Sequence, residues 1–169
     1  MNKDYESTHF GHAKGGATKI QSVDWWSPPE IFEKLDLVFD LDVAAPEGGV
    51  PWIPAMKHFT KKDDGLEQDW GDSLVWMNPP YGISTGSWLD KFIGHGNGIA
   101  LVFARTDTRW FHNYALKADA LCFTKGRLKF INPNRTETSS PAVGSLFIAI
   151  GTQSYYALQK ANLGWFVRL

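Results

Sequence analysis

The sequence has a single cysteine, Cys122, among its 169 residues. One cysteine cannot form an intramolecular disulfide, and it cannot build a zinc site that needs several thiolates. No apolar run approaches the ~20 residues that a membrane-spanning helix requires, so we expect no membrane partner. These absences exclude a disulfide-rich secreted scaffold and favour a reducing, cytoplasmic location.

The first 22 residues lack the apolar centre of a secretory signal, since they are polar and contain several glycines. His9 and His12 are spaced like a metal-binding pair on a helix, but Gly11 lies between them, so we expect no metal site here. We predict a flexible arm over residues 1–22 and one domain over residues 23–169, which is an ordinary length for a single core.

Charge is unevenly distributed along the chain, although the formal net charge is only -1. Residues 1–89 hold seven Lys and Arg against fourteen Asp and Glu, whereas residues 90–169 hold ten against four. An acidic region suits a ligand that carries positive charge, and a basic region suits a polyanion such as DNA. The alternative is that both kinds of charge mix on the folded surface and carry no functional meaning.

Helical and strand patterns alternate after residue 23, which predicts an α/β fold. Ser27 is placed to cap a first helix that begins in the Pro-Pro pair after it and ends near Asp36. An apolar–acidic alternation then predicts a strand over 37–43 that delivers Asp42 to its carboxyl end. The later elements are expected as strands over 74–77, 99–104 and 120–123, helices over 86–94 and 110–116, and an antiparallel pair of 128–131 with 145–150.

The stretch between the first two strands is short. About thirty residues separate residue 43 from residue 74, whereas a full run of helix, strand, helix, strand and helix would need roughly twice as many. We therefore expect a mixed sheet with an abbreviated middle section and an antiparallel C-terminal hairpin.

Asn78-Pro79-Pro80-Tyr81 directly follows a predicted buried strand, where open α/β sheets place their ligand sites. An exocyclic amino nitrogen is a poor nucleophile because its lone pair is delocalised into the ring of the base. The side-chain carbonyl of Asn78 and the backbone carbonyl of Pro79 could accept both amino hydrogens and localise that lone pair. Tyr81 offers a ring on which a planar base can stack. The alternative is a turn that only ends a strand.

The chain resembles the phage-type DNA N6-adenine methyltransferases from about Trp26 to Ile150. Six segments carry the resemblance, in order: Trp26-Ser27-Pro28; Asp40-Leu41-Asp42-Val43-Ala44-Ala45; Asp64-Gly65-Leu66 with Trp70; Asn78-Pro79-Pro80-Tyr81; Arg105-Thr106-Asp107-Thr108-Arg109-Trp110-Phe111; and Gly126-Arg127-Leu128-Lys129-Phe130.

The resemblance implies a Rossmann-like class I methyltransferase fold, S-adenosylmethionine as methyl donor and adenine N6 in double-stranded DNA as acceptor. It also implies a phage or prophage gene acting in the bacterial cytoplasm. The catalytic residues that it implies are Asn78, Pro79, Pro80 and Tyr81. The residues implied for cofactor binding are Trp26, Ser27, Pro28, Asp42, Ala44, Ala45, Asp64, Leu66 and Asn78.

One departure from the family pattern concerns the cofactor. The glycine-rich loop expected after the first strand is absent, since the corresponding turn reads Asp42-Val43-Ala44-Ala45-Pro46. Among the eight tryptophans, which are mostly expected in the core, Trp26 and Trp70 are the two most suited to stacking on a base.

Basic residues in the second half are candidates for DNA contacts. Arg105 and Arg109 could contact the phosphate backbone or line the base pocket, or they could be solvated side chains beside a helix cap at Asp107 or Thr108. The cations flanking the later turn and polar loop are Lys125, Arg127, Lys129 and Arg135. Two alternatives remain open: the same chemistry on RNA or on a protein glutamine, and a nucleic-acid-binding module with a degenerate cofactor site.

Overall fold

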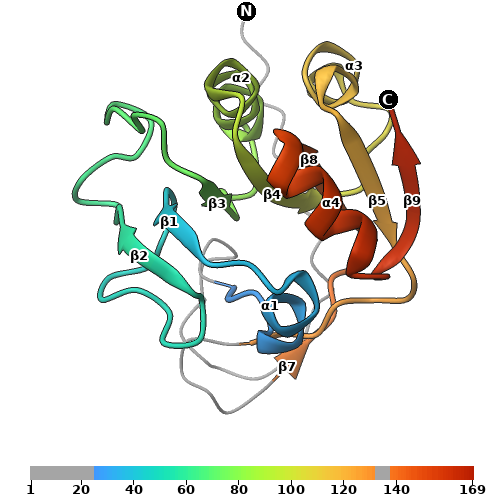
Figure 1. The fold of residues 1–169 in the computed structure, drawn as a ribbon, viewed down its shortest axis with the longest axis horizontal. Coiled ribbons are helices and arrows are strands. Elements are labelled where there is room, and N and C mark those ends of the chain that lie inside the picture. The colour runs from blue at the N-terminus through green and yellow to red at the C-terminus, as the bar shows by residue number, and fades with distance from the viewer. Residues whose placement is uncertain (1–24, 132–137) are drawn as a thin grey trace, which may run out of the picture.

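The computed structural model of the chain describes residues 25–131 and 138–169. The predicted arm over residues 1–22 lies outside the described residues. Seven strands form one mixed sheet in the order β2-β1-β3-β4-β8-β5-β9, and two short strands pair separately (Figure 1). The strands of the main sheet are β1 (Phe39–Asp42), β2 (Ala55–His58), β3 (Val75–Met77), β4 (Gly98–Phe103), β5 (Ala120–Thr124), β8 (Ser145–Ile150) and β9 (Gly164–Arg168).

Strand direction divides the sheet into two parts. Strands β2, β1, β3 and β4 are mutually parallel, whereas β8 runs antiparallel between β4 and β5, and β9 is antiparallel to β5. The carboxyl ends of β1, β3 and β4 therefore lie along one edge. The helices are α1 (Pro29–Leu35), α2 (Thr85–His95), α3 (Arg109–Asn113), the 3-10 turn η1 (Ala115–Lys117) and α4 (Thr152–Lys160).

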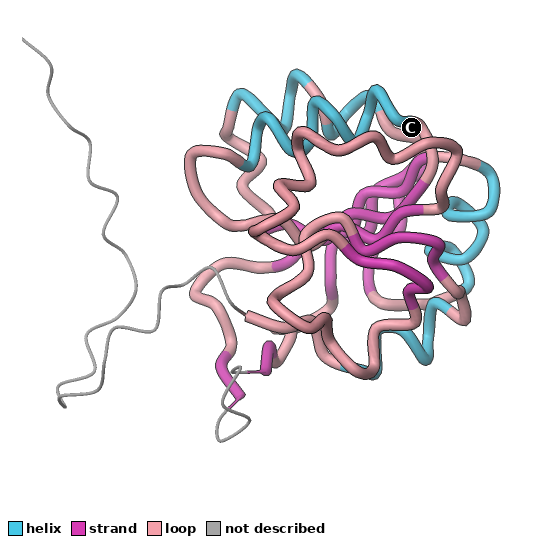
Figure 2. The backbone as a smooth tube through the Cα atoms, turned by 90° about the vertical axis from the view of Figure 1, so that its left-hand side faces the viewer, coloured by secondary structure: helices cyan, strands magenta, loops and turns pink. Residues whose placement is uncertain are grey.

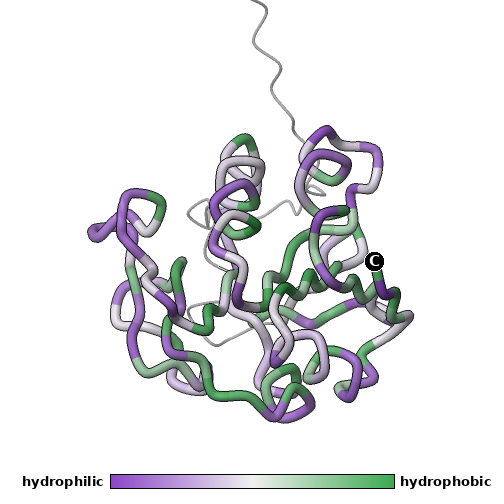
Figure 3. Tube along the Cα trace, turned by 45° about the horizontal axis from the view of Figure 1, so that its top comes forward, coloured by the Kyte–Doolittle hydropathy of each residue, from purple (hydrophilic) through white to green (hydrophobic). Residues whose placement is uncertain are grey.

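Helices cover both faces of the sheet and divide the core into two clusters (Figure 1). Successive residues of the central strands alternate between the clusters, because side chains of a strand point to opposite faces. On β3, for example, Trp76 packs under α1 and α4, whereas Met77 packs under α2 and α3. Hydrophobic residues accordingly run through the middle of the fold, with hydrophilic segments around them (Figure 3).

The first helix has its predicted place but not its predicted cap. Pro28 is the N-cap of α1 with no side-chain hydrogen bond, so the expectation that Ser27 caps the helix is wrong. Ser27 is instead buried, and its carbonyl accepts the indole N–H of Trp52 at 2.8 Å. Asp36 adopts the left-handed conformation at the C-cap, so the helix ends where the sequence predicts.

The predicted antiparallel pair of 128–131 with 145–150 is wrong. Strand β6 (Phe130–Ile131) pairs with β7 (Thr138–Ser139), and this small hairpin projects from the body (Figure 2). Residues 145–150 form β8, which is inserted between β4 and β5 in the main sheet. An apolar strand such as β8 buries both faces only inside a sheet, and a two-stranded hairpin cannot supply that burial.

Besides β7, three elements have no counterpart in the sequence prediction. Strand β2 is short and mostly exposed, and β9 is an edge strand with Trp165 in solvent, so neither has a clear apolar alternation. Helix α4 starts after Gly151 without a side-chain cap. The segment 43–74 contains β2 and no helix, in agreement with the predicted abbreviated middle.

No helix in the described part of the chain is both long enough and apolar enough to span a bilayer.

Candidate active site

Three predicted or newly found site residues stand at the carboxyl ends of neighbouring parallel strands. Asp42 is the last residue of β1, Asn78 follows β3, and Phe103 is the last residue of β4. Asp42 is in register with Trp76, so Asn78 lies two residues further along the adjacent strand. The α/β crossover thus brings these side chains to one edge, as expected for ligand sites of open sheets.

The side-chain amide of Asn78 is held by two hydrogen bonds. Its Nδ2 donates to the backbone carbonyl of Trp25 at 3.2 Å, and its Oδ1 accepts the hydroxyl of Tyr81 at 2.8 Å. Together the two bonds assign the orientation of the amide, with its oxygen turned toward Tyr81. The oxygen that the sequence predicts as an acceptor therefore already accepts the hydrogen of the Tyr81 hydroxyl.

Tyr81 is packed between aromatic side chains. Its ring stacks on Phe103 with centroids 3.8 Å apart and planes at 12°, and Phe130 meets it edge-on at 6.4 Å. Burial raises the pKa of the Tyr81 hydroxyl, which therefore stays protonated and acts as a donor. The predicted stacking surface is thus covered on one face by Phe103.

The double proline presents one free acceptor. Pro79 is buried, and within residues 25–131 and 138–169 no hydrogen bond to its backbone carbonyl is present. The ring fixes φ and removes the backbone donor, so the local conformation is restricted. An amide oxygen and a nearby backbone carbonyl are the two acceptors that an amino group with two hydrogens requires.

The segment 25–28 crosses the same edge. Trp26 and Ile131 exchange two backbone hydrogen bonds of 3.0 and 2.9 Å, which tie this segment to the β6 strand. The ring of Trp26 meets Trp52 edge-on at 5.6 Å. Trp25 contacts Asn78, and Trp26 pairs with Ile131 of the β6–β7 hairpin. The predicted cofactor residues Trp26, Ser27 and Pro28 therefore follow directly after a residue that contacts Asn78.

Asp42 is a buried carboxylate, with 4% of its surface exposed. Burial raises the pKa of Asp42 from 3.8 to about 7, although the Ala44 N–H that it accepts at 3.1 Å partly opposes this effect. No cationic side chain in the described residues forms an ion pair with it. A ligand that brings positive charge would stabilise the ionised form of such a group further.

The loop of Asp64, Gly65 and Leu66 packs against the end of β1. A Cβ on Gly65 would lie 2.1 Å from the carbonyl oxygen of Val43 and 3.0 Å from the ring of Trp88. Only a glycine fits at position 65, because any side chain would overlap the backbone of Val43. Asp64 is exposed and its carboxylate accepts the Leu66 N–H at 3.3 Å.

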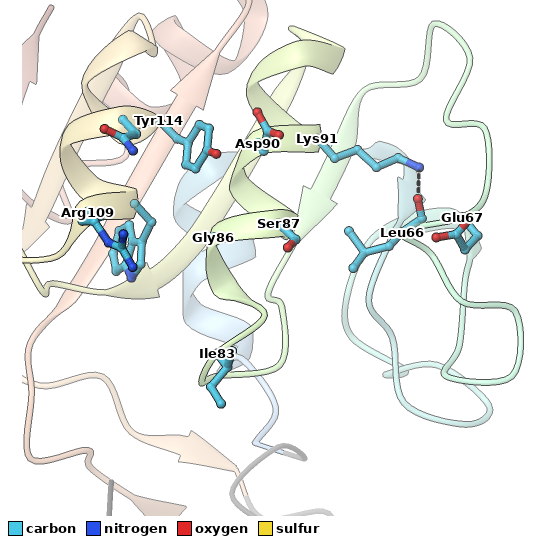
Figure 4. Close-up of a pocket in the computed structure, with 11 residues that line it drawn as sticks. Leu66, Glu67, Ile83, Gly86, Ser87, Asp90, Lys91, Arg109 and Tyr114 are labelled. Atoms are coloured by element: carbon cyan, nitrogen blue, oxygen red, sulfur yellow. Dashed lines mark hydrogen bonds between the residues drawn. The ribbon is translucent and has the colours of Figure 1, made fainter. Parts of the chain in front are cut away.

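Lys91 of α2 fastens this loop, as Figure 4 shows for the contact with Leu66. Its Nζ donates to the carbonyl of Leu66 at 2.6 Å and to the carbonyl of Gln68. The same ammonium lies 4.9 Å from the ring of Trp70. Trp70 is buried, stacks on Trp88 and donates its indole N–H to the Gly65 carbonyl, so the expectation that Trp70 could stack on a base is wrong.

We expect Gly65→Ala to destabilise the fold by about 3 kcal/mol, because the new methyl group overlaps a backbone oxygen that cannot move without disturbing β1. Urea denaturation would measure the loss. Gly94→Ala in α2 is the matched control, since a Cβ there meets nothing within 4 Å and should stabilise the helix by up to about 1 kcal/mol. Equal effects of the two substitutions would contradict the close packing of Gly65.

A surface groove of about 900 Å³ lies over α2 (Figure 4), and of the predicted cofactor residues Leu66 lines it. Its lining includes Ile83, Gly86 and Ser87 on one side, and Arg109 and Trp110 from α3 on the other. Neither Asp42 nor Asn78 lines it. The small side chains at positions 86 and 87 leave the groove open along the helix.

The predicted DNA-contacting cations fall into two exposed groups. Arg105 follows β4 and Arg109 begins α3. Thr108 is the N-cap of α3, which is one of the two cap positions that the sequence left open, but its side chain makes no capping hydrogen bond. The hydroxyl of Thr108 instead donates to the Arg105 carbonyl at 2.7 Å. The second group lies between β5 and β6 and comprises Lys125, Arg127 and Lys129. Arg135 lies outside the described residues.

Several residues of this edge were not identified from the sequence. They are Trp25, Trp52, Phe103 and Lys91, with Gly65 and Phe130 noted only as parts of longer motifs. Phe103 closes a predicted strand, so its position was a usable signal. The contacts of Trp25 and Lys91 join segments 53 and 25 residues apart, and no local pattern reports such pairs.

No group of three or more potential metal ligands occurs in the part of the chain that the structure describes.

Two fixed acceptors beside a buried acid suit the transfer of an electrophile to an amino nitrogen, and the mixed α/β sheet around them is that of a methyltransferase-like protein. The family model of the DNA N-6-adenine-methyltransferases (Dam) matches residues 15–158, and the chain belongs to this family. The protein is accordingly an enzyme that methylates the N6 amino group of adenine in DNA. The match does not favour the alternatives of RNA, a protein glutamine or a binding module. No curated protein matches the chain.

Proposed function

We propose that the methyl donor is S-adenosylmethionine, bound across the carboxyl ends of β1 and β3 in a Rossmann-like class I methyltransferase domain formed by residues 23–169. The parallel run β2-β1-β3-β4, with β8 inserted antiparallel beyond it, supports this assignment. Strands β1 and β3 both lie in the parallel part of the sheet. In open α/β sheets, ligands bind outside the carboxyl ends of such parallel strands.

The chemistry of the edge fits this cofactor. Asp42 is a desolvated carboxylate that lacks a cationic partner among the described residues, and the cofactor carries positive charge on its amino group and on sulfur. Gly65 provides a close backbone approach beside β1. The other residues proposed to contact the cofactor are Trp26, Ser27, Pro28, Ala44, Ala45, Asp64, Leu66 and Asn78.

The cofactor supplies an electrophilic methyl group on a sulfonium. The chain's own part is to orient the adenine: the Oδ1 of Asn78 and the carbonyl of Pro79 accept the two N6 hydrogens and favour a pyramidal nitrogen. The Tyr81 hydroxyl, 2.8 Å from Oδ1, marks the position that an N6 hydrogen would take. Adenine would displace this hydroxyl and stack on the Tyr81 ring. Pro80 keeps the turn rigid.

Adenine reaches this edge by extrusion from double-stranded DNA, because its N6 is paired inside the duplex. The two exposed cationic groups, which include Arg105, Arg109, Lys125 and Arg127, support phosphate contacts around the edge. Lys129 of the second group and Arg135, which lies outside the described residues, are proposed to make further phosphate contacts.

The main support for the proposal is the orientation of the Asn78 amide. Its Nδ2 is held by the Trp25 carbonyl, which leaves its Oδ1 on the side of Tyr81. The test is methyl transfer from isotopically labelled S-adenosylmethionine to duplex DNA, followed by digestion and identification of N6-methyl-2′-deoxyadenosine. Label on another atom of the DNA, or binding of DNA with no transfer, would contradict the proposal.

Replacing Tyr81 separates its two contacts. Tyr81→Ala should lower kcat/KM about 10- to 100-fold, because stacking of one base on an aromatic side chain contributes about 1–3 kcal/mol. Tyr81→Phe keeps the stacking ring and frees the Asn78 oxygen, so its kcat/KM should stay within about threefold of the wild type. Steady-state kinetics on the same duplex measures both. A larger loss in the phenylalanine variant would show that the hydroxyl itself takes part.

A further inference from the structure

Ile83 is a fully exposed apolar side chain, with a relative exposure of 104%, two residues after Tyr81. It stands in a tight turn between the catalytic motif and α2. The Gly82 N–H donates to the Thr85 Oγ1 at 3.3 Å, and the Thr85 N–H donates to the Gly82 carbonyl at 3.3 Å. These two bonds close the turn and present Ile83 at its tip, at the start of α2 (Figure 4).

The conformation of Gly82 and the exposure of Ile83 show what this turn contributes to the fold. Gly82 has φ of +135°, which side chains rarely adopt, yet a Cβ there would meet nothing within 4 Å. The glycine is therefore required by the conformation of the turn and not by lack of space. Because Ile83 buries none of its surface in this structure, it contributes no packing to the core.

Charges of both signs line the groove beside this apolar tip: Arg109 and Lys91 are basic, and Glu67 and Asp90 are acidic. Arg109 is exposed at the first turn of α3 and lines the same groove as Ile83, and the exposed Arg105 precedes it. A tip of this kind, beside cations that can hold phosphates, suits DNA better than an apolar protein surface. Apolar side chains next to phosphate-binding residues are used to enter DNA between base steps.

We propose that Ile83 enters the DNA base stack next to the target and supports the duplex while adenine occupies the Asn78 edge. Ile83 is thus a positioning residue. It contacts the bases that stay stacked in the duplex after the adenine has been extruded, and it does not contact the reacting atoms. Burial of its side chain among bases offsets part of the unstacking that extrusion requires. This inference rests on the proposed extrusion of adenine from the duplex.

The test compares Ile83→Ser and Ile83→Leu with the wild type on two duplexes that contain the target site, mapped by sequencing of N6-methyladenine. One duplex is fully paired, and the other has an abasic position opposite the target adenine, so that no base pair has to open. The fluorescence of 2-aminopurine placed at the target reports extrusion directly. Val38→Ser is the control, since Val38 is apolar and 65% exposed but precedes β1 at the opposite edge.

For Ile83→Ser we expect kcat/KM on the paired duplex to fall about tenfold or more, together with the fluorescence increase, and kcat/KM on the abasic duplex to stay within about threefold. Ile83→Leu and Val38→Ser should behave as the wild type on both. An equal fall on the two duplexes, or no fall on either, would overturn the role of Ile83. Absence of a fluorescence increase in the wild type would instead overturn the proposed extrusion, on which the inference rests.

Discussion

Asn78→Ala should lower kcat by about 100- to 1000-fold or more, a much larger effect than its effect on the affinity for S-adenosylmethionine, because eight other residues are proposed to contact the cofactor beside Asn78. The substitution removes the acceptor that is placed for the N6 hydrogen, and fixed polar groups of this kind contribute on that scale to transition-state stabilisation. The lost bonds to Trp25 and Tyr81 should cost the fold only about 1–2 kcal/mol, so the variant remains folded.

Single-turnover kinetics and calorimetric titration of the cofactor would measure the two effects separately. Asn78→Asp is the matched control, because it keeps an acceptor oxygen at the same position and replaces the donor to the Trp25 carbonyl by a second carboxyl oxygen. We expect the aspartate variant to retain much more activity than the alanine variant. Full activity of Asn78→Ala would remove the assignment of the motif as the catalytic centre.

Asp42→Asn should weaken S-adenosylmethionine binding by about 100-fold or more, since removing one member of a buried charge pair typically costs about 3–5 kcal/mol. The same substitution should raise protein stability at alkaline pH. The wild-type carboxylate is buried with a pKa raised to about 7, so keeping it ionised in the folded state costs free energy in the absence of a ligand.

The sign of the pH dependence follows from the two pKa values. The unfolded carboxyl group ionises near pH 3.8 and the folded one near pH 7, so the unfolded state loses its proton first as the pH rises. The free energy of unfolding therefore falls between these two values, by about 4 kcal/mol in total, and then stays level. In the asparagine variant this contribution is absent.

Urea unfolding of both proteins at pH 5 and pH 8 would test this expectation. We expect the stability of Asp42→Asn relative to the wild type to increase by about 2–3 kcal/mol from pH 5 to pH 8. Comparing the two proteins at each pH removes the contribution of all other titrating groups. A pH-independent difference would show that the carboxylate is ionised freely in the folded state, and it would weaken the case for Asp42 as a partner of a cationic ligand.

The sequence was informative wherever one short segment determines its own structure. The apolar runs that form β3 and β4 predict buried strands because both of their faces must be covered, and the structure confirms them within one or two residues. The same logic placed Asp42 and Asn78 at strand ends. It failed for β8, whose apolar pattern is equally compatible with several strand partners.

The residues by themselves determined the kind of chemistry: an Asn-Pro-Pro-Tyr turn after a buried strand, and an acid at the end of another. Only the tertiary structure decided that the Trp25 carbonyl anchors the Asn78 amide, that Phe103 covers one face of Tyr81, and that Gly65 approaches Val43. The physical reason is the sequence separation over which each kind of interaction acts. Backbone propensity and side-chain periodicity act over a few residues, whereas these contacts depend on strand order and on the fit of segments that are distant in the chain.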